Sequence, residues 1–171
     1  MEAYADDIVA LVTEIRDGRL PDPLRTMADP SRTALAGHST GGGAAVLAAM
    51  ETEGVAGVLG LDAWVEPLKE HIDAGLVIPQ LHLGSQQWRG GFSEPWLRRL
   101  GLASEPWASY RIEGSAHTDF TMIRYITSIA SLVGWAGKVN GERFASIATG
   151  VSSSWLMALL KDGPQAAVAA L

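Results

Sequence analysis

Apolar side chains recur at helical spacing near the start of the chain and gather in short continuous runs further on. Residues 4–15 place apolar side chains three and four positions apart until an Asp-Gly pair ends the pattern, which predicts an amphipathic helix that packs on a sheet. Apolar runs follow at residues 32–36, 55–61 and 78–83. Runs of this kind are typical of parallel strands buried on both faces.

Helical and loop segments separate these runs. Residues 39–50 predict a helix, although each of the three glycines at its start costs about 1 kcal/mol relative to alanine in a helix interior. Residues 66–75 predict a loop with a short helix, and residues 86–95 a loop rich in glycine and aromatic side chains. A short helix at 94–102 and a fourth, less apolar strand at 109–112 complete an alternation that predicts an α/β fold.

The remainder of the chain is expected to be helical. Apolar residues at helical spacing predict one long helix over 120–133, and an Asn-Gly pair at 140–141 interrupts the pattern. Residues 151–161 and 165–171 suit one or two terminal helices. Because the chain contains no internal repeat and no low-complexity linker, residues 1–171 are expected to form a single domain.

The first apolar run leads into a Gly-x-Ser-x-Gly pattern, formed by Gly37, His38, Ser39, Thr40 and Gly41. This pattern is the signature of a nucleophile elbow, a sharp strand-to-helix turn that exposes a serine hydroxyl. The turn needs residues without bulk two positions before and after the serine, where backbone segments nearly touch, and the two outer glycines fill those positions. The N–H of Thr40 is expected to point into an oxyanion hole, where a helix N-terminus favours negative charge.

A nucleophilic serine requires two partners further along the chain. A base must remove its proton, and an acid must fix the tautomer of that base. In hydrolases with this elbow the acid and then the histidine follow at the carboxyl ends of later strands. Asp62 ends the strand after the elbow, and His117 lies in the loop after the last strand. We therefore predict Ser39 as nucleophile, Asp62 as acid and His117 as base.

Other residues compete for the role of base. His38 lies inside the elbow, His82 lies within a strand, and His71 follows Asp62 but precedes the last two strands. Of these three, His71 is the strongest alternative to His117.

The role of acid also has alternatives. Asp73 lies in a helical or loop segment, and Asp119 lies only two residues from the predicted base. Asp62 itself could instead make local backbone hydrogen bonds at the end of its strand. Its place at a strand end favours it as the acid.

The chain contains six tryptophans, which is unusual at this length. Trp64 and Trp88 fall in loops beside the predicted catalytic segments, so they are candidates for lining an acyl or lipid pocket; core packing is the alternative for each. The others are expected in the core or on helices: Trp96, Trp107, Trp135 and Trp155.

Composition narrows the class of protein. The 13 basic and 19 acidic residues give a net charge of -6, so the chain lacks the excess of positive charge that is typical of nucleic-acid-binding proteins. The absence of cysteine excludes disulfides, thiolate zinc sites and a thiol nucleophile, and no metal-binding or phosphate-binding motif is present, so no metal and no cofactor are expected. The acidic N-terminus has no signal-peptide pattern and no apolar run could span a bilayer, so a soluble protein is expected, cytoplasmic as the chain is given; the sequence leaves the compartment itself open.

Four sequence blocks support a family resemblance. Gly-His-Ser-Thr-Gly-Gly at 37–42, Gly-Leu-Asp-Ala-Trp-Val-Glu-Pro-Leu at 60–68, Ile-Pro-Gln at 78–80 and Ile-Glu-Gly-Ser-Ala-His-Thr-Asp-Phe at 112–120 resemble, in this order, the platelet-activating factor acetylhydrolase branch of the α/β-hydrolases. The Leu-Asp-Ala-Trp-x-x-Pro-Leu block is far more specific than the elbow alone. Broader relatives, the dienelactone-hydrolase and polyester-hydrolase groups, share the Gly-His-Ser-x-Gly-Gly-Gly form of the elbow.

The resemblance implies an activity and its residues. Ser39, Asp62 and His117 match the family's nucleophile, acid and base, and the family hydrolyses short or oxidised acyl esters of phospholipids without metal. The expected partners are therefore a small ester or phospholipid substrate and a lipid surface.

The resemblance corresponds to the C-terminal half of the family, whose members carry several strands before the elbow strand. We therefore expect a truncated α/β-hydrolase fold of about four parallel strands flanked by helices, with the elbow strand at an exposed sheet edge. A loop of the missing half donates the second oxyanion N–H in the family, and loss of one such donor costs roughly 100- to 1000-fold in rate.

Two functional hypotheses follow from these observations. The first is a serine esterase whose activity is uncertain because the N-terminal half is missing. The second is a weakly active or non-catalytic interaction module, in which a second copy of the chain or the missing half completes the sheet along its exposed edge.

Overall fold

Four parallel strands, in the order β1-β2-β3-β4, form the sheet at the centre of this computed structural model, which describes residues 1–126, 130 and 134–170. The strands are β1 (Thr33–His38), β2 (Val55–Leu61), β3 (Gln80–Ser85) and β4 (Trp107–Ile112). The helices are α1 (Glu2–Arg16), α2 (Leu24–Met27), α3 (Thr40–Glu51), α4 (Glu94–Ala103), α5 (Ile123–Ile126), α6 (Gly141–Met157) and α7 (Pro164–Ala169). Short turns of 3-10 helix, η1 (Glu66–Leu68), η2 (Ile72–Ala74) and η3 (His117–Phe120), and one π-helical turn, η4 (Ala158–Asp162), complete the elements.

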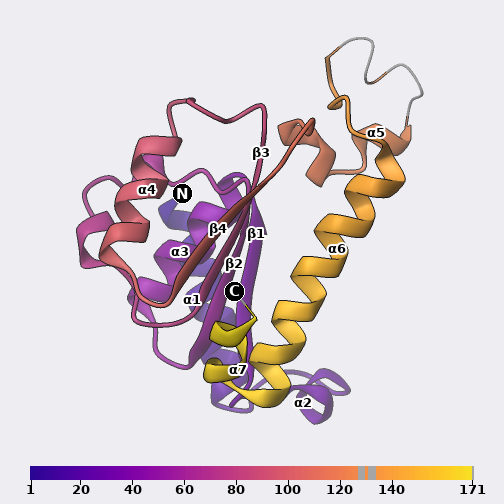
Figure 1. The fold of residues 1–171 in the computed structure, drawn as a ribbon. Helices are drawn as coiled ribbons and strands as arrows, with labels where there is room; N and C mark the ends of the chain where they lie inside the picture. Colours follow the sequence, from indigo (N-terminus) through magenta and orange to yellow (C-terminus); the bar gives the residue numbers. More distant parts are fainter. Residues whose placement is uncertain (127–129, 131–133, 171) are drawn as a thin grey trace.

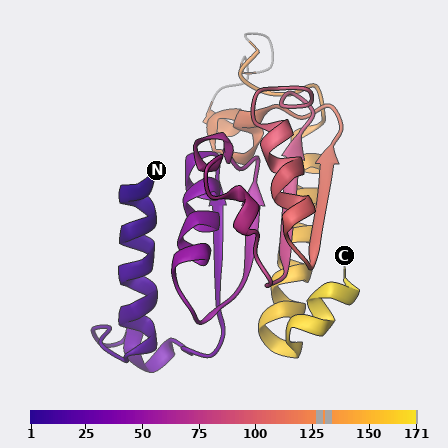
Figure 2. The same cartoon turned by 90° about the vertical axis from the view of Figure 1, so that its left-hand side faces the viewer.

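Helices cover both faces of the sheet. Helices α1, α3 and α4 lie on one face, and α6 and α7 lie on the other (Figures 1 and 2). The predicted α/β arrangement of four parallel strands flanked by helices is therefore confirmed. All four strands point the same way, so the loops at their carboxyl ends gather at one edge of the sheet, as the prediction of a shared site requires.

The larger part of the core lies between the sheet and α1, α3 and α4. Residues 42–49 of α3 are buried on every side because they are small or aliphatic and the helix lies between α1 and the strands. On the opposite face, Leu59, Leu81 and Leu83 of the sheet pack against Trp155, near the end of α6, and Leu159 of η4. The start of α6 diverges from the sheet (Figure 1).

Strand β1 lies at one edge of the sheet, as predicted. It pairs with β2 in parallel register, with Gly37 opposite Gly60 and His38 opposite Leu61. In the part of the chain that the structure describes, no strand pairs with its outer side.

Four boundaries of the predicted strands were wrong by two residues, among them the end of β3, at Ser85 rather than residue 83, and the start of β4, at Trp107 rather than residue 109. Strand β1 runs through Gly37 to His38 rather than ending at residue 36, because both residues keep their pairing with β2. Strand β3 begins at Gln80 rather than Ile78, because Pro79 has no N–H to donate and only its carbonyl group takes part, accepting from Val58.

The helices of the C-terminal third also differ from the prediction. The long helix expected over 120–133 is confirmed at α5 (Ile123–Ile126) but is wrong at residues 121–122, which separate α5 from η3, and at residue 130, which lies in a turn. Residues 127–129 and 131–133 of that prediction lie outside the described residues. The Asn-Gly pair at 140–141 begins a helix, because the Asn140 side chain accepts a hydrogen bond from the N–H of Arg143 as an N-cap.

No described helix combines the length and the apolar character that crossing a membrane requires.

His82, in the middle of β3, is a fully buried imidazole that stacks on Trp107 with ring centroids 4.3 Å apart. Burial disfavours its charged form and lowers its pKa from 6.5 to about 3. Below pH 6.5 the imidazole of His82 becomes protonated in the unfolded chain but stays neutral in the folded chain. Each further decrease of one pH unit therefore lowers the free energy of unfolding by about 1.4 kcal/mol, until the pH approaches the folded-state pKa.

We therefore expect His82→Phe to reduce the loss of stability in mild acid. Between pH 6.5 and about pH 5, the unfolding free energy of the parent protein should fall by about 2 kcal/mol more than that of the variant. Urea unfolding at several pH values measures this difference. Parallel pH profiles for the two proteins would show that His82 is not responsible.

Candidate active site

Ser39 occupies a strained turn between β1 and α3. Its φ of 55° lies in the left-handed region that side chains other than glycine rarely adopt. The turn is held by hydrogen bonds from the Ser39 N–H to the Leu61 carbonyl group (3.0 Å) and from the Trp64 N–H to the Ser39 carbonyl group (2.9 Å). Strain of this kind persists where surrounding bonds fix the backbone, and it is typical of functional sites.

The glycines of the elbow have different structural roles. A Cβ at Gly37 would lie 2.3 Å from the carbonyl carbon of Gly41, so the first glycine is required sterically. A Cβ at Gly41 would meet nothing within 4 Å, so the expected requirement for a small residue there was wrong. The close approach involves Gly42 instead, where a Cβ would lie 2.7 Å from that of Ala63.

The three predicted triad residues lie in hydrogen-bond contact. The Nε2 atom of His117 is 3.0 Å from the Oγ atom of Ser39, and its Nδ1 atom is 3.0 Å from the Oδ2 atom of Asp62. Asp62 is 5% exposed, whereas the His117 and Ser39 side chains are half-buried. Contact with the carboxylate favours a proton on Nδ1 and leaves Nε2 free to accept the hydroxyl proton.

Each of the three triad residues follows the carboxyl end of a strand. Ser39 follows β1 and Asp62 follows β2, while His117 begins η3 after β4. Asp62 also has a positive φ, of 45°, and its N–H donates to the Leu83 carbonyl group at 2.7 Å. The parallel sheet therefore brings three residues that are distant in sequence to one place.

The N–H of Thr40 lies at the start of α3, as the predicted oxyanion site requires. The first four N–H groups of a helix have no partner within the helix, and they carry its positive dipole end. The position next to Ser39 is therefore chemically suited to an anionic oxygen.

The alternative histidines make other contacts. The Nε2 atom of His38 lies 3.1 Å from the carbonyl oxygen of His117, and burial followed by the charge of His117 lowers the pKa of His38. His71 is exposed beside η2, and His82 is buried in the core.

Asp119 and Asp73 are also occupied elsewhere. The Asp119 carboxylate is buried, accepts from the Ala116 N–H (2.8 Å) and pairs with Arg124 (2.8 Å), so it braces the loop that carries His117. Asp73 pairs with Arg99 at the surface, with Nε of Arg99 2.6 Å from Oδ1 of Asp73.

An aromatic cluster borders the base. The indole of Trp88 stacks on His117, with ring centroids 4.1 Å apart and planes 6° apart. The ring centroid of Phe92 lies 5.7 Å from that of Trp88 and 6.3 Å from that of Trp64, and Phe92 is 62% exposed. The Nε1 atom of Trp64 is buried without a hydrogen-bond partner among the described residues.

The remaining tryptophans largely match their expected places. Trp155 is buried, and Trp96 and Trp107 are partly buried against the core. The expectation for Trp135 was wrong, because it is 59% exposed in a turn after Gly134.

Sequence reasoning missed three residues next to the triad: Ser85, Phe92 and Arg111. Ser85 donates to both oxygens of Asp62, and Arg111 donates to the Ser85 carbonyl group at 2.8 Å. Ser85 ends β3, next to the strand that carries Asp62, so its strand-end position was the available signal. Nothing in the local pattern marked Phe92 or Arg111.

Two pockets of the described structure lie at different distances from the triad. One pocket, of about 790 Å³, lies between β4 and α6 and is lined in part by Ile112, Val139 and Ile147. A small cavity of about 90 Å³ adjoins Asp62 and Trp88. Among the described residues, no group of three His, Cys, Asp or Glu side chains could hold a metal ion.

Comparison with known proteins gives concordant matches. The family model for platelet-activating factor acetylhydrolase, isoform II, matches residues 21–167. A platelet-activating factor acetylhydrolase of Bos taurus is 21% identical over 140 residues, which cover 82% of this chain and 31% of that protein. The solved structure of a ferulic acid esterase from Streptomyces cinnamoneus superposes with a TM-score of 0.64 at 24% identity, over 96% of this chain and 48% of that one.

These matches have two consequences. The structural likeness shows a shared fold, that of the α/β-hydrolases. The chain spans about a third of the length of the curated relative and about half of the solved structure.

Proposed function

This chain belongs to the family of platelet-activating factor acetylhydrolase, isoform II, and on that premise we propose that it is a serine carboxylic-ester hydrolase. The observation that carries the proposal is the pair of contacts that His117 makes: its Nε2 atom lies 3.0 Å from Ser39 Oγ, and its Nδ1 atom lies 3.0 Å from Asp62 Oδ2. Nucleophile and base within hydrogen-bond reach, with a third group orienting the base, are the signature of an activated nucleophile.

The proposed reaction has two stages. Ser39 Oγ attacks the ester carbonyl carbon while His117 Nε2 takes the hydroxyl proton, and the imidazolium then returns that proton to the leaving alcohol. A water molecule, activated by the same imidazole, then hydrolyses the acyl-serine ester and releases the acid. Asp62 orients His117 and stabilises its charged form throughout.

The backbone stabilises the oxyanion in this proposal. As the carbonyl carbon becomes tetrahedral, the Thr40 N–H donates to the developing negative oxygen, supported by the dipole of the 12-residue helix α3. Because α3 is buried over most of its length, this donor is fixed in place before the reaction begins.

We propose short-acyl esters, including phospholipid esters, as the substrate class. The family match and the Bos taurus relative support this assignment, and the cluster of Trp64, Trp88 and Phe92 offers an apolar surface beside the base. The name of the solved neighbour adds a second candidate, an ester of an aromatic acid such as ferulic acid, for which the same aromatic side chains could provide stacking partners.

A fluorophosphonate probe tests the proposed function. Such probes react with an activated serine hydroxyl, so we expect a stoichiometric adduct on Ser39, detected by intact-mass measurement and peptide mapping. Absence of an adduct under conditions that label a known serine esterase would refute the proposal. A comparison of acetyl, butyryl, long-chain and feruloyl esters would then distinguish the substrate classes.

A further inference from the structure

The loop that follows β3 contacts the acid of the proposed triad. The N–H of Ser85 donates to Oδ1 of Asp62 at 2.7 Å, and the Ser85 hydroxyl group donates to Oδ2 at 2.5 Å. Ser85 is completely buried. The two bonds fix the carboxylate plane, and the oxygen that receives the hydroxyl bond is the one that faces His117 Nδ1.

The same loop contacts the base. The backbone N–H of Trp88 donates to Ser85 Oγ at 3.3 Å, and the Trp88 indole lies flat against the imidazole of His117. The ring of His38 also contacts the imidazole, at a centroid distance of 4.4 Å. The Ser85 hydroxyl group thus donates a hydrogen bond to Asp62 and accepts one from Trp88. It acts as both donor and acceptor, and it links the acid to the residue that stacks on His117.

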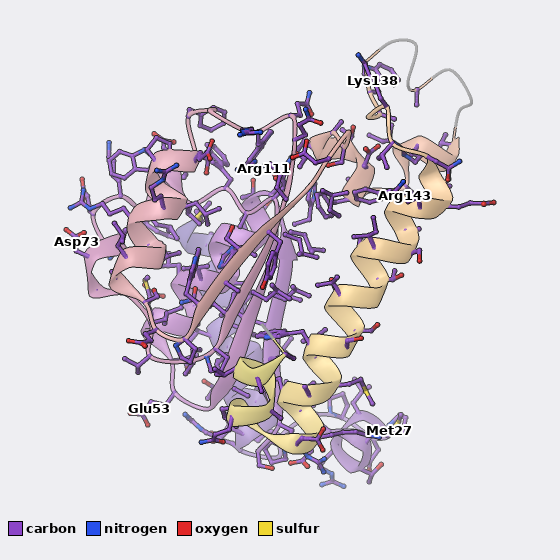
Figure 3. All side chains as sticks on the ribbon, in the orientation of Figure 1. Met27, Glu53, Asp73, Arg111, Lys138 and Arg143 are labelled. Atoms are coloured by element: carbon purple, nitrogen blue, oxygen red, sulfur yellow. The ribbon has the colours of Figure 1, made fainter. Side chains whose placement is uncertain are left out.

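Further hydrogen bonds hold this loop to the neighbouring segments. Gln87 Oε1 accepts from the His117 N–H at 2.8 Å, and the Gln86 N–H donates to Ser115 Oγ at 3.2 Å. Arg111, labelled on β4 in Figure 3, donates to the Ser85 carbonyl group and pairs with Glu94 at 3.1 Å. The loop is therefore fixed from both sides before a substrate arrives.

We propose that Ser85 and Trp88 are positioning residues of the active site: Ser85 orients the Asp62 carboxylate, and Trp88 orients the His117 imidazole. This inference rests on the proposed esterase function. The electron-rich face of the indole also attracts the positive charge that His117 acquires when it takes the proton of Ser39. Neither side chain needs to touch the reacting ester bond in order to orient the acid or the base.

Substitutions at the two positions should lower kcat. For Ser85, which is completely buried, KM should stay almost unchanged, whereas Trp88 also belongs to the proposed apolar surface beside the base, so its variants are compared by kcat. We expect Ser85→Ala to reduce kcat for a soluble acetyl ester by about 100-fold, because a small misplacement of a catalytic group has an effect of this size. Trp88→Leu removes the aromatic face and should reduce kcat by about tenfold, whereas Trp88→Phe keeps such a face and should stay within about threefold.

Matched controls are available within the chain. Ser104 is a buried serine whose hydroxyl group accepts from the Leu76 N–H at 3.0 Å, and Trp107 stacks on the buried imidazole of His82. Neither makes a hydrogen bond or a ring contact with the triad in the described part of the chain, so Ser104→Ala and Trp107→Leu should leave kcat within about threefold while removing comparable contacts. Thermal unfolding of all variants shows whether each remains folded.

A spectroscopic measurement makes the test independent of turnover. The proton shared by His117 Nδ1 and Asp62 should give a downfield NMR resonance, which we expect to broaden or disappear in Ser85→Ala and to persist in Ser104→Ala. A folded Ser85→Ala variant with unchanged kcat, unchanged probe labelling and an unchanged resonance would overturn the inference while leaving the esterase proposal intact. A parent protein that shows no hydrolysis and no labelling would refute the esterase proposal instead.

Discussion

Replacing Ser39 by alanine is expected to lower kcat for ester hydrolysis by about a million-fold, because a serine-hydrolase triad without its nucleophile loses nearly its whole contribution to catalysis. The KM should change little, because Ser39 Oγ contacts His117 and the substitution leaves the aromatic cluster of the site intact. Steady-state kinetics with a soluble acetyl ester and mass spectrometry after probe treatment measure both effects.

Ser153→Ala provides the control for this experiment. Ser153 is exposed on α6, and its hydroxyl group donates to the Thr149 carbonyl group of the same helix. Its replacement should leave both hydrolysis and labelling unchanged. If Ser39→Ala retains most of the activity of the parent protein, the nucleophile lies elsewhere and the proposed mechanism is wrong.

Replacing Asp119 by alanine is expected to lower the unfolding free energy by about 3–5 kcal/mol, because it leaves the charge of a largely buried Arg124 without its carboxylate partner. The side chain of Asp119 is 0% exposed and that of Arg124 is 11% exposed, so the pair lies largely out of contact with solvent. The carboxylate also accepts from the Gly137 N–H at 3.1 Å, so its loss would release the connection between η3 and residues 134–140.

Asp73→Ala is the matched control, because Asp73 also pairs with an arginine but does so in solvent. Exposed ion pairs of this kind contribute little, so its replacement should leave the denaturation midpoint almost unchanged. Urea unfolding with several probes measures both variants. Equal midpoints for Asp119→Ala and the parent protein would contradict the bracing role assigned to the buried pair.

Local sequence patterns were informative where one physical cause dominates. The apolar run at 55–61 predicted the bounds of β2, because a strand buried on both faces needs no other signal. The elbow was visible because the close approach at Gly37 excludes any side chain. Asp62 and His117 were chosen over their alternatives because they follow the carboxyl ends of later strands, and these two residues do contact each other.

The prediction failed where tertiary contacts compete with local periodicity. Residues 120–126 have helical spacing, yet the Asp119 carboxylate accepts from the Ala116 N–H and pairs with Arg124, and residues 121–122 separate η3 from α5. The start of α6 carries few large apolar residues, so its pattern was weak, and its N-cap at Asn140 looked like a break. Trp135 was expected inside because large aromatic side chains usually are, but its turn leaves it exposed.

The sequence by itself determined the class of fold and the elbow, because these follow from short-range periodicity and from a steric requirement at one turn. It also indicated three residues suited to a triad, because the acid and the base are expected at the ends of strands that follow the elbow. Only the tertiary structure decided how those residues meet and what holds them. The distances of 3.0 Å, the two bonds from Ser85 to Asp62 and the stack of Trp88 on His117 join segments from β1, β2, β3 and the loop after β4. Contacts between strands that are distant in sequence depend on register and side-chain direction, which no local pattern specifies.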